Sequence, residues 1–449
     1  MRLLILGWTC IGLAAAASSS FNHDVLPVLQ KNCQSCHRPG EVAPMSFMTY
    51  QDTRPWAKAI KAAVLSKKMP PWFADPKYGH FLNDRRLSDA EIKVLVGWAD
   101  GGAPEGDAKD KPAALQFTEG WNIKPDVVVG MPNAFEVPAS GILEYQYIVV
   151  PTGFDKDMWV TAAEVRPGNR AVMHHVLIYA RAPGSNFLKD APPGVPFVPV
   201  QYERDANGAA VRRIPPPGPP PANNGQPRGD PMAGVELLAA FAPGLQAQRF
   251  DSPVADAAKL VPAGSDLVFQ LHYTTNGKPA TDQTKVGFQF ASNPPKYRYL
   301  TKDATQRDFE IPPNEPNYET HSMVTFNSPA QLVWLMPHMH VRGKDFLYQV
   351  VYPTGETETL LSVPKYNFNW QIGYEEAKPL VIPKGTRIEC TAHHDNSVNN
   401  PANPNPNASV RWGDQTWEEM MMGFFSVVVD AGVKPQDVLV RPPGRRPAL

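Results

Sequence analysis

Short apolar segments separated by turn residues dominate the chain from about Gln116 onward, and this pattern constrains the fold more than any other feature. Segments such as "LEYQYIVV", "DLVFQLHYTT" and "MMGFFSVVV" are rich in β-branched and aromatic residues, which favour strands. Turn sequences such as "YPTGE" interrupt them, and the 49 prolines and 32 glycines of this 449-residue chain favour many turns over long helices. The sequence therefore predicts an all-β region long enough for two jelly-roll-like sandwich domains.

The pattern also predicts how the whole chain is divided. We expect a boundary between the two sandwiches in the segment "ASNPPKYRYL", and we expect the proline-rich segment "RRIPPPGPPPANNGQPRGDP" to be an exposed spacer inside the first sandwich. The expected parts are a signal peptide at 1–20, a small all-α domain at 21–110, a linker at 111–124, a first sandwich at 125–293 with its insertion at about 185–232, and a second sandwich at 294–449.

The first residues, "MRLLILGWTCIGLAAAASSS", have the three regions of a secretory signal. Arg2 precedes an apolar core, and a run of small residues follows it. Elsewhere the sequence never approaches the ~20 consecutive apolar residues that a spanning helix needs. We therefore expect a periplasmic or secreted protein with no membrane span. The net charge of -1 gives no electrostatic footprint for nucleic acid.

The segment "NCQSCHRPG" contains Cys33, Cys36 and His37 in the C-x-x-C-H pattern of c-type haem attachment. In this pattern two thiols form covalent links to the haem and the histidine ligates its iron. A redox dithiol and half of a zinc site are the alternatives for the cysteine pair. The helical segments around the motif are Phe21 to Lys31, "WAKAIKAAVLSKK" and "LSDAEIKVLVGWAD", the last of which opens with a Ser88-x-x-Glu91 capping box.

Three short helices around such a motif resemble a small class I cytochrome c, over about residues 21–110. This resemblance implies one covalent haem c, with a methionine as the second axial ligand of the iron. We expect that methionine to be Met69, in "KKMPPW", because it follows a predicted helix and two prolines stiffen the segment after it. Met45 and Met48 are expected to fill the core.

The remaining sequence contains two groups of histidines that metal ions could use. His338 and His340 lie one residue apart in "QLVWLMPHMHVRGKDF", so on a strand they point to the same face. His174 and His175 are adjacent and would point apart unless a bulge intervenes, and His272 lies on the more polar face of its strand. The candidates for a third ligand beside His338 and His340 are Cys390, His393, His394 and the methionines of "TWEEMMMGFF".

The order and spacing of these motifs resemble a known family over about residues 125–440. A His-His pair, a lone histidine in "LHYTTNG", an H-x-H before "VRGKDF", then "RIECTAHHDNS" and "WGDQTWEEMM" are similar to the copper type II, ascorbate-dependent monooxygenases. That is the family of the peptidylglycine alpha-hydroxylating and dopamine beta monooxygenases. Its members have two β-sandwich domains that face each other across a solvent cleft, with one copper in each.

The resemblance implies a function and its ligands. The enzyme would hydroxylate a C–H bond of a small organic substrate with O2, and electrons would pass from haem c to the first copper and then to the second. An ascorbate-like reductant or another cytochrome would be the external electron donor. The implied ligand sets are His174, His175 and His272 for the electron-transfer copper, and His338, His340 and Met420 for the copper that binds dioxygen.

Departures from the family pattern narrow the expected substrate. In the peptide-processing enzyme an Arg, an Asn and a Tyr hold the substrate carboxylate, and this chain has Met336, Met422 and Phe424 at those places. Because a buried carboxylate needs a cation, the pattern predicts a less polar substrate. The family's disulfides are absent too, so we expect Cys390 to be a buried free thiol.

Two other functions fit parts of the sequence. In the first, Cys390, His393, His338 and a methionine form a blue-copper site in a non-catalytic haem and copper electron carrier. In the second, a three-histidine site with an open position serves a zinc hydrolase.

Overall fold

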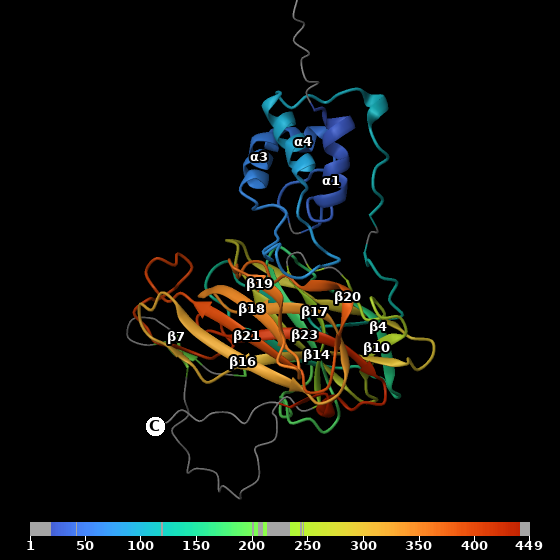
Figure 1. The fold of residues 1–449 in the computed structure, drawn as a ribbon, viewed down its shortest axis with the longest axis vertical. Helices are drawn as coiled ribbons and strands as arrows, with labels where there is room; N and C mark the ends of the chain where they lie inside the picture. The colour runs from blue at the N-terminus through green and yellow to red at the C-terminus, as the bar shows by residue number, and fades with distance from the viewer. Residues whose placement is uncertain are drawn as a thin grey trace, which may run out of the picture. The chain divides into compact units, whose positions relative to one another are not determined.

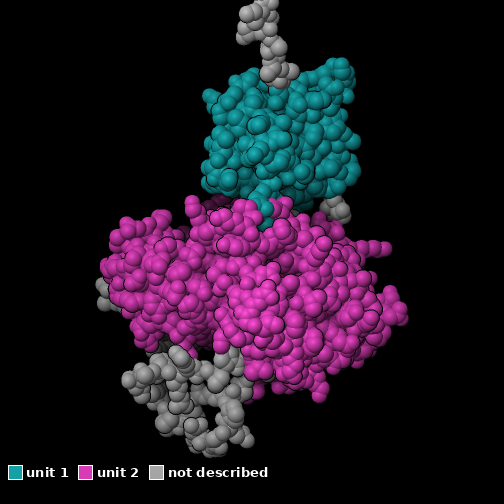
Figure 2. Space-filling view, viewed as in Figure 1, with its two compact units in different colours: residues 1–72, 85–117 teal, residues 73–84, 118–449 magenta. Residues whose placement is uncertain are grey.

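The computed structural model describes residues 19–41, 43–117, 120–199, 202–204, 210–212, 234–242, 245 and 247–440. Nearly all of the expected signal peptide and most of the expected proline-rich insertion lie outside these residues. The chain forms two compact units (Figure 2). Unit 1 comprises Met1–Trp72 and Arg85–Phe117, and unit 2 comprises Phe73–Asp84 and Thr118–Leu449.

Unit 1 is the small helical part that the sequence predicts, and its helices enclose a core of large apolar side chains. Phe21, Leu95 and Trp98 have no exposed surface. The predicted capping box is present, since Ser88 and Glu91 bond to each other's backbone N–H groups at the start of α4. The α-helices are α1 (Leu26–Asn32), α2 (Tyr50–Thr53), α3 (Ala57–Leu65) and α4 (Asp89–Asp100), with a π-helical turn at Phe21–Val25 and 3-10 helical turns at Arg54–Trp56 and Ala108–Asp110 (Figure 1). None of the helices in the described residues is long and apolar enough to cross a bilayer.

The segment Phe73–Asp84 was expected to lie inside the helical domain, but it pairs with the strands of unit 2. Its backbone hydrogen bonds join Asp75 N to Ser362 O at 2.8 Å and Leu82 N to Glu375 O at 2.8 Å. These bonds satisfy backbone groups of both partners, which explains why a segment without regular structure of its own is held there. The helical unit is therefore discontinuous in sequence.

Unit 2 is built from β-sheets, and every strand segment quoted from the sequence contains a strand in the structure. A nine-stranded sheet in the order β1-β13-β4-β10-β14-β23-β17-β20 runs through the unit, with β9 attached to β4. A four-stranded sheet (β3-β11-β5-β8) and a five-stranded sheet (β19-β18-β21-β16-β24) accompany it. Pairs β12-β2, β15-β22 and β6-β7 complete the described strands.

The bounds of these strands are β1 Val127–Gly130, β2 Phe135–Val137, β3 Gln146–Pro151, β4 Met158–Arg166, β5 Met173–Arg181, β6 Tyr202–Arg204, β7 Ala210–Arg212, β8 Val235–Phe241, β9 Gln248–Arg249, β10 Ala257–Val261, β11 Asp266–Tyr273, β12 Ala280–Asp282, β13 Lys285–Phe290, β14 Tyr297–Gln306, β15 Glu310–Ile311, β16 Tyr318–Phe326, β17 Ala330–His338, β18 Gly343–Val351, β19 Thr357–Val363, β20 Tyr374–Ile382, β21 Arg387–His394, β22 Val410–Arg411, β23 Met421–Asp430 and β24 Leu439–Val440.

The two halves of unit 2 share their largest sheet. The expected boundary at residues 293 and 294 lies between β13 and β14. Yet β10 from the first half pairs in parallel with β14 from the second, through Ala257 with Tyr297 and Ala258 with Arg298. A single sheet therefore carries strands from both halves, and this continuity fixes how side chains from the two halves meet.

Candidate metal centre

A β-bulge brings His174, His175 and His272 together. His272 on β11 lies directly opposite His175 on β5, and the next pair along the two strands is Tyr273 with Met173. His174 is therefore the extra residue of the bulge, which turns its side chain toward the face that His175 shares with His272. Two adjacent histidines on a strand can serve one ion only if a bulge turns one of them, and the structure contains this bulge.

The ring nitrogens of these three histidines converge. One nitrogen from each ring can be chosen so that all three atoms lie within 4.8 Å of one another. The Nδ1 atoms of His174 and His175 are 3.2 Å apart. Among the described residues, the buried Nδ1 of His272 and Nε2 of His174 have no hydrogen-bond partner. Buried nitrogens without partners are costly in a protein unless an ion uses their lone pairs.

The protonation state suits metal binding. Burial and, to a smaller extent, the nearby His338 lower the pKa of His174 to about 4. Burial and the neighbouring imidazoles hold the pKa values of His175 and His272 well below the ordinary value. The rings are thus neutral at physiological pH, as metal ligands must be. This group can hold a metal ion.

The structure also brings His338 and His340 together, at the end of β17. Their ring centroids are 5.4 Å apart and their planes are perpendicular. The Nδ1 of His338 lies 2.8 Å from Gln371 Oε1, and the Nδ1 of His340 lies 3.2 Å from the backbone oxygen of Glu418. Both rings are thereby oriented by their Nδ1 atoms, and the buried Nε2 of His340 has no hydrogen-bond partner among the described residues.

A buried carboxylate braces the turn that contains this pair. Glu419 has no exposed surface, and it accepts hydrogen bonds from the backbone N–H groups of His340, Arg342 at 3.0 Å and Met420 at 2.9 Å. Burial raises the pKa of Glu419 to about 7, while those donors act in the opposite direction. One side chain therefore ties the H-x-H segment to the segment that carries Met420.

The predicted thioether ligand lies next to β23, a strand that pairs with β17. Met420 is half-buried and directly precedes β23. On β23 the residue opposite His338 is Met422, so these two side chains share a face of the sheet. Met420 lies two residues before Met422, just outside β23. That Met420 is a ligand stays a prediction.

Two aromatic rings lie near both histidine groups. The ring centroid of Tyr145 is 4.4 Å from that of His272 and 6.5 Å from that of His340. Phe368 stacks on His174 at 4.9 Å and lies 6.1 Å from His340. The resemblance implies a solvent cleft between the two sites, but here both groups lie against the same aromatic side chains.

The other candidate ligands are placed elsewhere. On β21 the residues alternate between buried and partly exposed, so Cys390 and His393 point to opposite faces. Cys390 is a buried free thiol, as predicted. The two nitrogens of His393 lie 2.7 Å from Asp345 Oδ1 and 3.2 Å from Glu319 Oε2, in a partly exposed ion-pair network. A blue-copper site that uses both Cys390 and His393 is incompatible with this geometry.

His394 lies near Glu419 and is not part of the second histidine group. It is fully buried, and its Nε2 lies 3.1 Å from Thr320 Oγ1. Its Nδ1 is 4.0 Å from Glu419 Oε2. That separation is too long for a hydrogen bond, and this Nδ1 has no hydrogen-bond partner among the described residues.

In unit 1 the C-x-x-C-H segment forms a turn at the end of α1. The N–H groups of Cys36 and His37 both donate to the Cys33 carbonyl, at 3.1 Å and 2.9 Å. Burial raises the pKa of the Cys33 thiol to about 12, whereas the attacking cysteine of a redox dithiol needs a lowered pKa. The His37 ring stacks on Phe47 at 4.3 Å, and its Nδ1 lies 3.3 Å from the Met45 carbonyl oxygen. This arrangement leaves Nε2 as the nitrogen that could ligate iron.

Met69 lies after α3 in unit 1 and is half-buried. Its N–H donates to the Ala63 carbonyl at 3.3 Å, so the backbone here folds back on the last turn of the helix. Its role as an axial ligand stays a prediction.

Sequence reasoning did not identify the residues that orient the histidines. Gln371, Glu419, Tyr145 and Phe368 are ordinary polar and aromatic residues in the sequence, far from the histidines that they touch. Only Glu419 carries a local signal, because it directly precedes the predicted ligand Met420.

No protein-family model matches the sequence, and no curated protein matches it. Among solved structures, the infectious bursal disease virus Gx strain is similar at 12% identity over 73% of this chain and 76% of that chain, with a TM-score of 0.19. The VP2 subviral particle of that virus is similar at 10% identity over 73% and 76%, with a TM-score of 0.17. PNGF-II is similar at 9% identity over 68% and 59%, with a TM-score of 0.23. Likeness at this level carries no argument about function.

Proposed function

We propose that this chain is a haem-fused, copper-dependent monooxygenase that hydroxylates a C–H bond of an organic substrate. The observation that carries the proposal is the bulge in β5, which gathers three neutral histidines whose nitrogens lie within 4.8 Å of one another. Imidazole suits copper in both oxidation states, so His174, His175 and His272 are suitable ligands for a copper that stores and releases one electron.

The second copper would use His338, His340 and Met420. Gln371 and the Glu418 carbonyl contact the Nδ1 atoms of the two rings, which selects Nε2 of each ring for the ion. A thioether favours Cu(I), so an imidazole pair with one methionine keeps the ion reduced until oxygen arrives. Met422 lies opposite His338, and Met420 lies two residues before it, next to the start of β23, which supports a thioether near this position.

The haem would be held in unit 1 by Cys33, Cys36 and His37, with Met69 as its second axial ligand. A high thiol pKa disfavours a redox dithiol, and the Met45 carbonyl orients the His37 ring for ligation through Nε2. A covalent haem supplies single electrons to an enzyme that consumes them one at a time.

The overall reaction sets what the cofactors must deliver. One oxygen atom of O2 enters a C–H bond to form C–OH, and the other leaves as water, which consumes two electrons and two protons. The electrons come from an external donor, either an ascorbate-like reductant or another cytochrome. In this proposal the buried, neutral histidines hold the two coppers, and the haem reloads them.

Metal analysis and the visible spectrum test this proposal. We expect haem bands, two coppers per chain and only weak copper absorption. An intense blue band would indicate a copper–thiolate site, and zinc in the histidine group would indicate a hydrolase. His272→Ala and His338→Ala should each remove one copper and leave the other. His321→Ala is the matched control, since its side chain is 62% exposed. The two-site proposal is wrong if both variants lose the same ion.

The role of the haem has its own test. The fully reduced protein is mixed with O2 and substrate in a stopped-flow instrument while the haem band is followed. We expect haem oxidation that depends on substrate, keeps pace with product and disappears in His174→Ala. Haem that stays reduced while product forms would show that the haem does not feed the coppers.

A further inference from the structure

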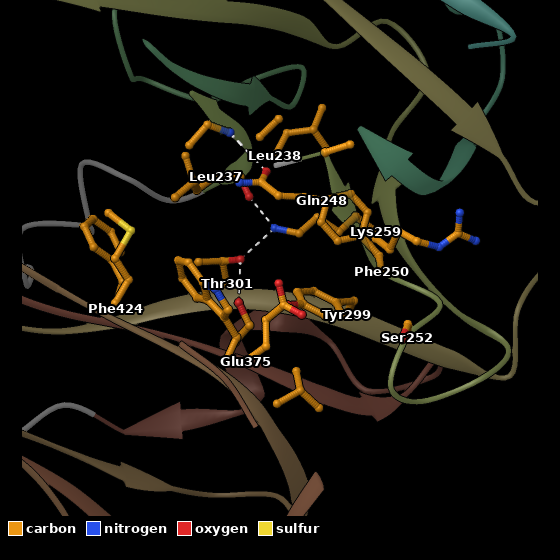
Figure 3. A pocket seen from close by; sticks show the side chains of 18 of the residues that line it. Leu237, Leu238, Gln248, Phe250, Ser252, Lys259, Tyr299, Thr301, Glu375 and Phe424 are labelled. Atoms are coloured by element: carbon orange, nitrogen blue, oxygen red, sulfur yellow. Dashed lines mark hydrogen bonds between the residues drawn. The ribbon is translucent and has the colours of Figure 1, made fainter. Parts of the chain in front are cut away.

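A cavity of about 210 Å³ lies between β8 and the face of the shared sheet formed by β14, β17 and β23. Large apolar side chains line most of it (Figure 3). They include Leu237, Leu238, Phe250, Tyr299, Trp334 and Phe424. Aromatic and aliphatic walls of this kind are typical of sites for small organic ligands.

The charged groups in the cavity wall are already compensated. Lys259 is 1% exposed, and its ammonium forms an ion pair with Glu236 Oε1 at 3.2 Å and donates to Thr301 Oγ1 at 2.7 Å and to the Leu237 carbonyl. An ammonium has three N–H donors, so these contacts use all of them. Arg249 is likewise paired with Asp251, at 2.7 Å.

Glu375 also lines the cavity, and it too has an interaction partner. The two cations of the described wall are therefore already paired, and Glu375 has a partner of its own. An ionised ligand would lose part of its hydration and would have to compete with these existing partners for a counter-charge, which is costly.

One end of the cavity adjoins the second histidine group. Trp334, Met336 and His338 alternate along β17, so their side chains share one face, and the first two line the cavity. Successive residues on one face are about 6.6 Å apart. Phe424 lies opposite Met336 on β23, and its ring centroid is 6.2 Å from that of His338.

From these contacts we infer that the cavity binds the organic substrate, and that the substrate is an uncharged molecule the size of a single aromatic ring with a short side chain. An apolar cavity of about 150 Å³ holds benzene, so about 210 Å³ accommodates a ring with a few more carbons. The reacting C–H bond is directed past Met336 and Phe424 toward His338. This inference rests on the proposed function for the reaction itself, but the binding can be measured without it.

The test uses the full, metal-loaded protein without oxygen, with ethylbenzene as the probe and isothermal titration as the readout. We expect ethylbenzene to bind one per chain and at least tenfold more tightly than phenylacetate or phenethylamine. Ala240 lines the cavity on β8, so Ala240→Val should weaken binding and Ala240→Phe should weaken it at least tenfold. Ala402→Phe places the same side chain on an exposed loop and should change nothing.

The outcomes separate this inference from the proposed function. Binding that is equal in wild type and in both Ala240 variants, or tighter for either charged analogue, would overturn the cavity assignment. So would a failure of ethylbenzene to bind to a protein that still turns over another substrate. Tight, variant-sensitive binding without any later reaction with O2 would instead contradict the monooxygenase and leave the cavity as a ligand site.

Discussion

Replacing Gln371 should weaken one metal site selectively. Gln371 is 3% exposed, and its Oε1 lies 2.8 Å from the Nδ1 of His338. An oxygen at this place accepts a hydrogen bond from Nδ1–H, and it thereby selects the tautomer whose Nε2 lone pair can bind a metal ion. Gln371→Ala removes that acceptor and lets the ring rotate or change tautomer.

The expected loss follows from one buried hydrogen bond. Leaving a buried donor without its acceptor costs about 1 to 3 kcal/mol. At about 1.4 kcal/mol per factor of ten, this cost corresponds to about a 5- to 150-fold loss of copper affinity. Outer hydrogen bonds to metal-binding histidines typically contribute about 10- to 100-fold, which agrees.

Competition titrations with a copper chelator measure the affinity of each site. Gln371→Glu is the matched control, because it keeps an oxygen acceptor for His338 but loses the amide that donates to the Phe368 carbonyl at 3.1 Å. We expect Gln371→Glu to bind copper like the wild type and Gln371→Ala to lose affinity at one site only. Equal affinities in Gln371→Ala and wild type, or an equal loss at both sites, would refute the reasoning.

Met420→Ala should abolish oxygen-dependent turnover and leave the haem and the copper of the three-histidine group in place; unchanged oxygen consumption would move the thioether to another methionine. Burial, with a neighbouring carboxylate second, raises the pKa of Glu376 from 4.5 to about 8. The stabilisation that the neutral carboxyl gives the folded state is complete below pH 4.5 and is lost as pH rises through about 8. The thermal stability of the wild type should therefore fall by a few kcal/mol over this range, at about 1.4 kcal/mol per pKa unit, whereas that of Glu376→Gln should depend less on pH. Parallel stability profiles for the two proteins would contradict this. Replacing Cys33 and Cys36 together by Ala should eliminate covalent haem, measured by intact mass, whereas Cys390→Ala should retain it; haem still attached to the double variant would exclude this motif.

Local patterns in the sequence predicted the elements and several site residues. The capping box at Ser88 and Glu91 depends on contacts within one helical turn, and it is present as expected. Strand segments such as "LEYQYIVV" and "DLVFQLHYTT" could be predicted because side chains alternate along any extended chain. The same alternation defined the condition under which His174 and His175 could converge, since adjacent residues need a bulge to do so.

The segment Phe73–Asp84 could not be assigned from sequence. Its ties to unit 2 include backbone hydrogen bonds to strand residues far away in the sequence, such as Leu82 N to Glu375 O at 2.8 Å. Backbone groups are the same in every residue, so such pairing leaves no trace in local composition.

Only the tertiary structure decided how the site is completed. The parallel pairing of β10 with β14 joins the halves of unit 2, and it brings Lys259 and Phe424 into the wall of one cavity. Gln371 meets His338 across a separation of 33 residues, and Glu419 meets His340 across 79. Periodicity in the sequence predicts which face of a strand is buried, but it does not predict which distant strand covers that face. That choice is made by the register and packing of the whole sheet, and it determines which side chains orient the histidines.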